Sequence, residues 1–127
     1  MSIKRAWSAS PYEQSIGFCR AIRVGPQIHL AGTAAFDSSG QIVAPGDAYQ
    51  QACRCLEIAR EALQDLGADL SQTYRVRWYL TDISQQDQVA KAHREHFSTN
   101  PPVATMLQVQ ALVAPELCVE LELEAWA

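Results

Sequence analysis

The feature that most constrains this chain is a long amphipathic segment near its middle, residues 47–66, with the sequence DAYQQACRCLEIAREALQDL. Its apolar residues recur at three- and four-residue steps, which places them on one stripe of an α-helix. Asp47 can accept hydrogen bonds from the free amides of the first turn, and Gly67 can adopt the left-handed conformation that ends a helix. At about 1.5 Å per residue the helix would be roughly 30 Å long. So long a stripe needs a broad apolar partner, and we expect the face of a β-sheet.

Apolar-rich and alternating runs on both sides of this helix predict that sheet. Three strands are expected before it and three after it, with a second helix at residues 85–97; the predicted strands are 3–7, 16–24, 27–34, 73–82, 103–109 and 117–126. Gly25-Pro26 marks a hairpin between the second and third strands. The order β-β-β-α-β-α-β-β predicts an α+β fold in one domain, residues 1–127, with a mixed sheet and both helices packed on one of its faces.

The alternation also predicts which side chains face the helices. The inward set is Tyr74, Val76, Trp78, Leu80, Leu117, Val119, Leu121, Leu123 and Ala125. The outward set is Arg75, Arg77, Tyr79, Thr81, Cys118, Glu120, Glu122 and Glu124. Two helices cover only one face, so the outward set is left without a partner. We expect that face to pair with copies of the chain, and ligand sites often form between subunits.

Charge and hydropathy exclude several classes of function. The net charge of −4 disfavours sequence-independent nucleic-acid binding, which needs clustered Lys and Arg. No apolar run approaches the roughly 20 residues that span a bilayer, and residues 1–10 lack the apolar core of a signal peptide. We therefore expect a cytoplasmic protein that binds neither nucleic acid nor membrane.

Cysteines and histidines do not predict a metal site. Cys53 and Cys55 point about 200° apart on a helix, so they cannot share one ion. His93 and His96 can share a helix face, but no third ligand is evident. We expect small, partly buried thiols, no disulfides and no metal.

Short motifs, in order along the chain, make residues 12–127 similar to the RidA family, also called YjgF/YER057c/UK114. They are Ile16-Gly17-Phe18, Val24-Gly25, His29-Leu30-Ala31-Gly32-Thr33, Leu66-Gly67-Ala68, Tyr79-Leu80-Thr81-Asp82, Pro102-Val103-Ala104-Thr105-Met106 and Leu121-Glu122-Leu123-Glu124-Ala125. The resemblance implies a chorismate-mutase-like protomer and a homotrimer whose sheets form a central barrel, with a ligand cleft between neighbouring subunits. It also implies hydrolysis of reactive enamines or imines, such as 2-aminoacrylate, to a keto acid and ammonia without any cofactor.

This chain departs from the family pattern where the substrate carboxylate would bind. The family arginine of the penultimate strand is replaced by Ala104, the next site residue is Met106, and a tyrosine is replaced by Phe18. The acidic residue of the last strand corresponds to Glu122, although a slip of two positions would select Glu120 on the same face. The chain therefore resembles the arginine-less branches of the family.

Other residues are candidates to bind the ligand. Gly32 and Thr33 match the loop that brings backbone amides close to it, and Thr105 offers a hydroxyl. Arg75 and Arg77 are candidates to replace the missing arginine, or they pair with Glu120, Glu122 and Glu124 across the sheet. By the same family resemblance, Glu13 and Arg20 correspond to positions near the cleft entrance.

Three functions remain open on this basis. The first is a trimer that binds a small polar metabolite between subunits and hydrolyses an imine or enamine, with Glu122 positioning the water. The second is a non-enzymatic metabolite-binding or regulatory protein. The third, disfavoured by the acidic charge, is an endoribonuclease or translation inhibitor.

Overall fold

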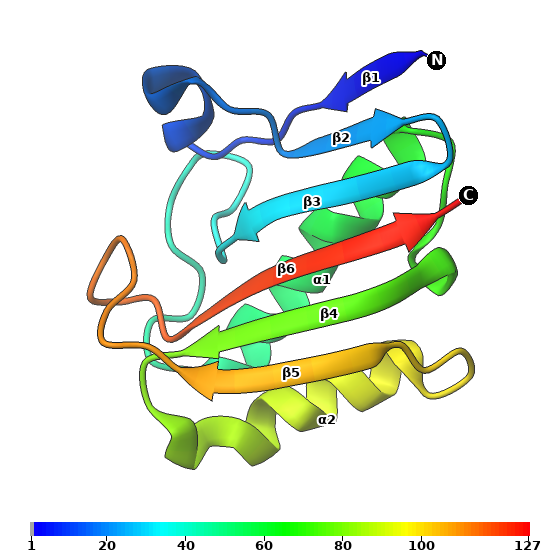
Figure 1. Cartoon of the computed structure of the whole chain (residues 1–127). Helices are drawn as coiled ribbons and strands as arrows, with labels where there is room; N and C mark the ends of the chain where they lie inside the picture. The colour runs from blue at the N-terminus through cyan, green and yellow to red at the C-terminus, as the bar shows by residue number, and fades with distance from the viewer. Residues whose placement is uncertain (1) are drawn as a thin grey trace.

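The computed structural model describes residues 2–127 and contains one six-stranded sheet with two helices on one of its faces (Figure 1). The strands are β1 (Ile3–Ala6), β2 (Ala21–Val24), β3 (Gln27–Thr33), β4 (Thr73–Leu80), β5 (Val103–Gln108) and β6 (Val119–Trp126). The helices are α1 (Ala48–Asp65) and α2 (Gln86–Phe97), with short turns η1 (Glu13–Gly17), η2 (Leu70–Gln72) and η3 (Ile83–Gln85). This confirms the α+β prediction and the order of the elements.

The sheet is mixed, with the strand order β1-β2-β3-β6-β4-β5. Strands β4 and β5 are parallel and are connected by α2, whereas the other neighbours are antiparallel. The last strand, β6, therefore lies between β3 and β4, where it joins the two halves of the sheet (Figure 1).

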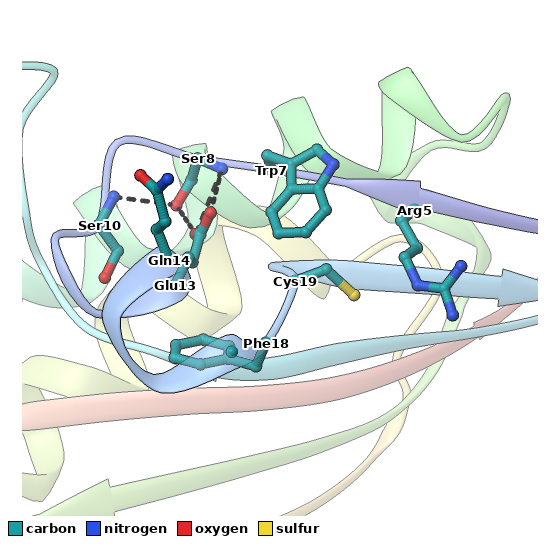
Figure 2. A pocket seen from close by; sticks show the side chains of 9 residues that line it. Arg5, Trp7, Ser8, Ser10, Glu13, Gln14, Phe18 and Cys19 are labelled. Carbon is teal, nitrogen blue, oxygen red and sulfur yellow. Dashed lines mark hydrogen bonds between the residues drawn. The ribbon is translucent and has the colours of Figure 1, made fainter.

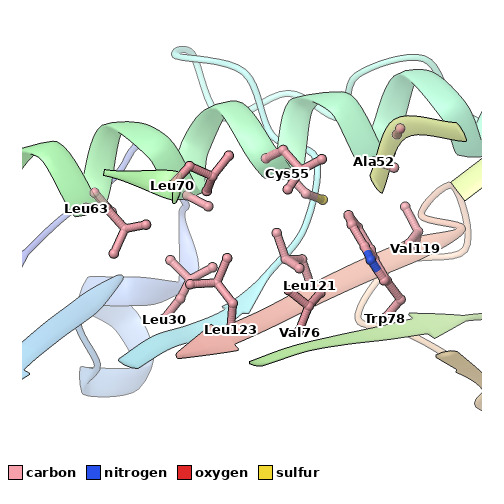
Figure 3. Close-up of a cluster of buried hydrophobic side chains, with 14 of the residues drawn as sticks. Leu30, Ala52, Cys55, Leu63, Leu70, Val76, Trp78, Val119, Leu121 and Leu123 are labelled. Carbon is pink, nitrogen blue, oxygen red and sulfur yellow. The ribbon is translucent and has the colours of Figure 1, made fainter. Parts of the chain in front are cut away.

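Helix α1 matches its prediction. The Asp47 carboxylate accepts a hydrogen bond from the Gln50 N–H at 3.0 Å, and Gly67 has φ 79°. Its apolar stripe covers the sheet, so that Ala52, Cys55 and Leu63 face side chains of β3, β4 and β6 (Figure 3). Burying a leucine such as Leu63, which is 0% exposed, contributes about 1.5 to 3 kcal/mol. Packing against the sheet is thus what keeps the helix in place.

The predicted strand at residues 16–24 is wrong in its first half. Only Ala21–Val24 forms β2, because residues 13–17 make a single π-helical turn, η1, that leads to Gly17 with φ 98°. Ile16 is 69% exposed rather than part of the sheet. The cause is a buried ion pair in this segment, described below.

Two further predictions of facing are wrong. Tyr74 is 43% exposed, because the register of β4 against β6 shifts between Thr73 and Arg75 and Thr73 takes the buried place. Cys118 was predicted to face outward, but it precedes β6 and is 6% exposed. Its N–H donates to Gln51 Oε1 at 2.9 Å, which holds it against α1.

Opposite the helices, the sheet has an uncovered face. Cross-strand register places there Ile3, Arg5, Ile22, Val24, Gln27, His29, Arg75, Arg77, Tyr79, Val103, Thr105, Leu107, Glu120, Glu122, Glu124 and Trp126. Several of its large apolar side chains are exposed, including Val103 at 59% and Trp126 at 57%. Within residues 2–127, no helix has the length and apolarity needed to cross a membrane.

Candidate functional site

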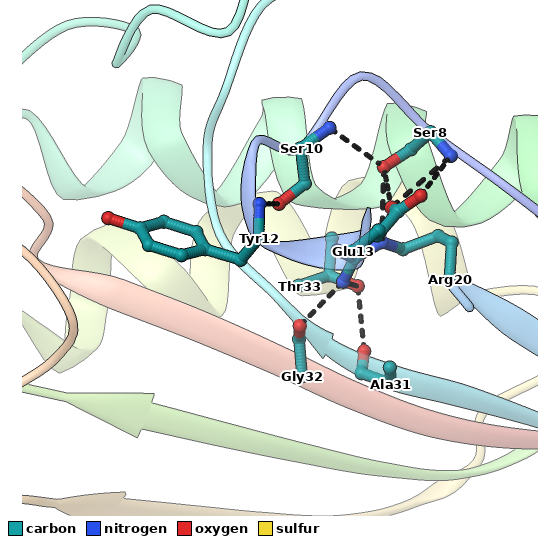
Figure 4. Close-up of polar contacts among 8 residues, drawn as sticks. All are labelled: Ser8, Ser10, Tyr12, Glu13, Arg20, Ala31, Gly32 and Thr33. Atoms are coloured by element: carbon teal, nitrogen blue, oxygen red, sulfur yellow. Dashed lines mark hydrogen bonds and ion pairs between the residues drawn. The ribbon is translucent and has the colours of Figure 1, made fainter. Parts of the chain in front are cut away.

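A buried ion pair organises the chain before β2. Glu13 and Arg20 are 4% and 3% exposed, and Arg20 Nε donates to Glu13 Oε2 at 2.9 Å. The Ser8 N–H donates to Glu13 Oε1 at 2.9 Å, and the Ser8 hydroxyl donates to Glu13 Oε2 (Figure 4). Both carboxylate oxygens are therefore occupied, and residues 8–20 are folded around them.

The other end of Arg20 holds the end of β3. Its Nη1 donates to the Gly32 carbonyl oxygen at 2.6 Å and to Thr33 Oγ1 at 3.1 Å, while the Thr33 hydroxyl donates to the Ala31 carbonyl at 2.7 Å (Figure 4). The register of β3 against β6 shifts between Leu30 and Thr33, so these bonds fix an irregular stretch of strand. Arg20 Nη2 donates to no group within residues 2–127.

A small cavity of about 150 Å³ lies beside this network. It is lined by Ser10, Tyr12, Ile16, Phe18, Arg20, Gly32, Ala34, Phe36, Val113 and Glu120. Most of the lining is apolar, with one guanidinium and one carboxylate among it. A small ligand with a polar group and an apolar body suits such a lining.

Gly32 is required by the position of Glu120. A Cβ on residue 32 would lie 2.6 Å from Glu120 Oε2, closer than a side chain tolerates. The glycine therefore lets the carboxylate lie directly against the backbone of β3 at the cavity.

The electrostatic surroundings shift the pKa of Glu120. Burial raises the pKa of this carboxyl, the neighbouring charge of Glu122 raises it further, and the cation of Arg20 opposes both. A carboxyl whose pKa lies above its ordinary value exchanges protons more readily near neutral pH than an exposed one. It is suited to general acid–base chemistry.

Glu122 and Arg77 make contacts across the uncovered face. The Tyr79 hydroxyl donates to Glu122 Oε1, and this bond raises the pKa of the Tyr79 phenol. Arg77 Nη1 lies 2.9 Å from Glu124 Oε1. Of the two readings of Arg77, pairing with the glutamates is the one seen in the protomer.

The remaining candidates lie on β4 and β5 and do not line the cavity. Ala104 pairs with Val76 and is on the helix side, while Thr105 pairs with Arg77 and is on the uncovered face. Arg75 lies opposite Glu124, four residues along β6 from Glu120. The candidates thus form two groups. The first is at the cavity: Phe18, Arg20 and Gly32 line it, and Glu13 and Thr33 bond to Arg20. The second, Arg75, Ala104 and Thr105, lies apart from it.

Sequence reasoning missed several lining residues. Tyr12, Phe36 and Val113 come from three separate connections, and no periodic pattern marks them. The sequence offered Glu120 only as the alternative to Glu122. What distinguishes Glu120 is its close approach to Gly32, and recognising that contact requires the register of β3 against β6. No group of three or more His, Cys, Asp or Glu residues that could hold a metal ion is found in residues 2–127.

Comparison with known proteins gives consistent relatives. The family model described as Endoribonuclease L-PSP matches residues 9–127. An uncharacterised protein of Streptomyces coelicolor is 34% identical over 125 residues, which cover 98% of this chain and 92% of that protein. The human 2-iminobutanoate/2-iminopropanoate deaminase is 30% identical over 112 residues, 87% of this chain and 81% of that enzyme.

The solved structures agree with the sequence relatives. Rv2704 of Mycobacterium tuberculosis, a member of the YjgF/YER057c/UK114 family, superposes with a TM-score of 0.89 at 35% identity, over 99% of this chain and 100% of that one. The fold and the sequence thus point to the same group of proteins.

Proposed function

This chain belongs to the RidA (YjgF/YER057c/UK114) family, and on that premise we propose that it binds a small polar metabolite and hydrolyses an imine or enamine to a carbonyl compound and ammonia. The observation that carries the proposal is the Glu120 carboxylate, held against Gly32 in a cavity that Arg20 also lines. The human relative that is named as an imine deaminase supports the reaction class.

In the proposed reaction, water adds to the imine carbon while a carboxylate accepts a proton from it. With the imine nitrogen protonated, this addition gives a neutral carbinolamine, and the carboxyl then returns its proton to nitrogen. As the C–N bond breaks, the hydroxyl proton passes to the departing ammonia, so that one protonated imine and one water give one C=O bond and one ammonium ion. We assign this proton transfer to Glu120, because it lines the cavity. Glu122, the residue matched by motif, bonds to Tyr79 and is the alternative.

The substrate anion needs a cation other than the family arginine, since Ala104 offers none. Arg20 lies at the cavity, and its Nη2 is unused within residues 2–127. Arg77 is bonded to Glu124 in the protomer, and Arg75 and Thr105 can reach a cavity only if it belongs to a neighbouring copy.

We propose that such a copy is present and that the protein is a homotrimer with its ligand sites between subunits. The exposed apolar side chains of the uncovered face, with Val103 at 59% and Leu107 at 40%, support this assembly. Light scattering on the purified protein should then give about three times the 14.0 kDa chain mass. The four free cysteines support a reducing, cytoplasmic location.

The test is ammonia release from a panel of enzymatically generated imino acids. Wild type is compared with Glu120→Gln, Glu122→Gln and Arg77→Ala, and with Glu124→Gln as the control on the same face of β6 but outside the cavity. We expect Glu120→Gln to lose at least about a hundredfold in rate and Glu124→Gln to retain activity. Equal rates in wild type and Glu120→Gln would remove the assigned role.

A non-enzymatic metabolite-binding or regulatory protein is the second candidate, favoured by Ala104 in place of the arginine. Absence of ammonia release on every substrate, with a melting temperature raised by a metabolite, would establish it. An endoribonuclease, the activity in the family model's description, is disfavoured by the net charge of −4. RNA cleavage by the wild type that is lost in Glu122→Ala would establish the endoribonuclease function instead.

A further inference from the structure

A second and larger cavity shares Ser10 and Phe18 with the small one. It encloses about 590 Å³ between the end of β1 and the segment around η1, and its lining includes Arg5, Trp7, Glu13, Phe18 and Cys19. Figure 2 shows Arg5 and Trp7 projecting from the chain of β1 toward the same side, with the hydrogen-bonded Ser8 and Glu13 at the other end. The proposed reaction uses none of Arg5, Trp7 and Cys19.

The free charge in this cavity is positive. Arg5 lies on the outermost strand of the uncovered face; in the single protomer it is exposed and makes no hydrogen bond or ion pair with the described part of the chain, residues 2–127. The acid in the lining, Glu13, is 4% exposed, and both its oxygens already accept bonds from Ser8 and Arg20. An unpaired guanidinium beside a neutralised carboxylate attracts an anion, and it binds carboxylates through two parallel N–H donors.

The walls of the cavity are aromatic. Trp7 is 59% exposed. It follows Arg5 by two residues, so the two side chains project to the same side of the extended chain. The Phe18 ring is half-buried, with the guanidinium carbon of Arg20 at 5.3 Å from its centroid. A large exposed indole next to a free cation is suited to a flat ligand that stacks on the ring while its charge reaches the guanidinium.

We propose that this cavity is a binding site for a small planar aromatic carboxylate, with Arg5 binding the carboxylate and Trp7 stacking on the ring. The site adjoins the small cavity, because Ser10 and Phe18 line both, but Glu120 does not line it. Arg5 pairs with Ile22, Ile22 with His29 and His29 with Glu124, so three strand spacings, about 14 Å, divide Arg5 from β6. The proposal therefore does not rest on imine hydrolysis.

The test is a fluorescence titration with nicotinate, a planar aromatic carboxylate, and with nicotinamide, its neutral counterpart of nearly the same shape. We expect nicotinate to quench tryptophan emission saturably and nicotinamide to bind at least about tenfold more weakly, because the neutral amide cannot form a charge-assisted pair with the guanidinium. Arg5→Gln should weaken nicotinate binding by a similar factor, and Trp7→Phe should abolish most of the quenching.

Each variant has a matched control in the chain. Lys4 is the neighbouring exposed cation on the other face of β1, opposite Arg23, so Lys4→Gln should bind nicotinate as wild type does. Trp126 is as exposed as Trp7, at 57%, but lies on β6, so Trp126→Phe should leave the quenching intact. Equal affinities for nicotinate in wild type and Arg5→Gln, equal affinities for the two probes, or no saturable quenching would each overturn the proposal.

Discussion

Replacing Glu13 with glutamine tests whether the buried pair holds the site together. The amide retains one acceptor oxygen but presents an NH₂ group to either the Ser8 N–H or the Arg20 Nε, both of which are donors now bonded at 2.9 Å. Arg20, 3% exposed, would also lose its counter-charge. Breaking a buried pair from one side costs about 3 to 5 kcal/mol, and we expect the lower end because one hydrogen bond survives.

This loss is large enough to measure by melting. For 127 residues, the entropy of unfolding is about 0.27 kcal/mol per degree, so a loss of about 3 kcal/mol lowers the melting temperature by roughly 11 °C. The measurement is urea and thermal unfolding at fixed protein concentration, because assembly makes stability depend on concentration.

The same substitution at Glu57 is the control. Glu57 pairs with Arg54 at 2.7 Å, but its side chain is 58% exposed, so Glu57→Gln should cost about 0 to 1 kcal/mol. The double variant Glu13→Gln/Arg20→Met should lose less stability than the two single variants lose in sum, because the second change removes the unpaired cation. If Glu13→Gln costs no more stability than Glu57→Gln, the buried pair does not stabilise the fold.

Three further predictions follow from individual contacts. Gly32→Ala should cost little stability, about 1 kcal/mol or less, because the Glu120 side chain can move. It should still lower ammonia release, because the new Cβ would lie 2.6 Å from Glu120 Oε2 and displace that carboxylate; unchanged turnover would contradict this. Because the pKa of Glu120 is raised in the folded state, its carboxyl binds a proton more tightly there than in the unfolded chain. The unfolding free energy of wild type, relative to that of Glu120→Gln, should therefore fall as pH rises from about 4.3 through the folded pKa. Denaturation at a series of pH values measures this, and no such fall would exclude the raised pKa. Burial lowers the pKa of His93, whose neutral Nδ1 accepts from the Trp78 indole N–H at 3.0 Å. Stability should therefore be lost as pH falls from about 6.5 through the folded pKa, and denaturation of His93→Gln at a series of pH values should show no such loss.

Strong periodicity made the core predictable. The stripe of α1 and the inward residues Val76, Trp78, Leu121 and Leu123 lie where alternation placed them, because burial of one face is a property of consecutive residues. Tyr74 and Cys118 departed from that pattern for local reasons, a shift in register at one and the Gln51 side chain at the other.

The candidate site could be predicted only in part. The family resemblance gave nine candidates to bind the ligand, of which Phe18, Arg20 and Gly32 line the small cavity. It did not identify Glu120 as the acid at that cavity, since Glu120 and Glu122 share a face and differ only in which neighbour each one meets. Nor did it place Arg5 and Trp7, whose relation to Phe18 depends on how η1 folds back.

The sequence by itself determined the α+β class, the order of the elements, the helix α1 and the face that it covers, because each depends on periodicity within a short run of residues. Tertiary structure alone decided that Glu13 and Arg20 are a buried pair, that Glu120 lies on Gly32 and that Arg77 bonds to Glu124. These contacts join residues from different strands and turns, and a change of two residues in register would exchange one glutamate for another on the same face. Local sequence carries too little information to settle that choice, whereas packing of the whole sheet does.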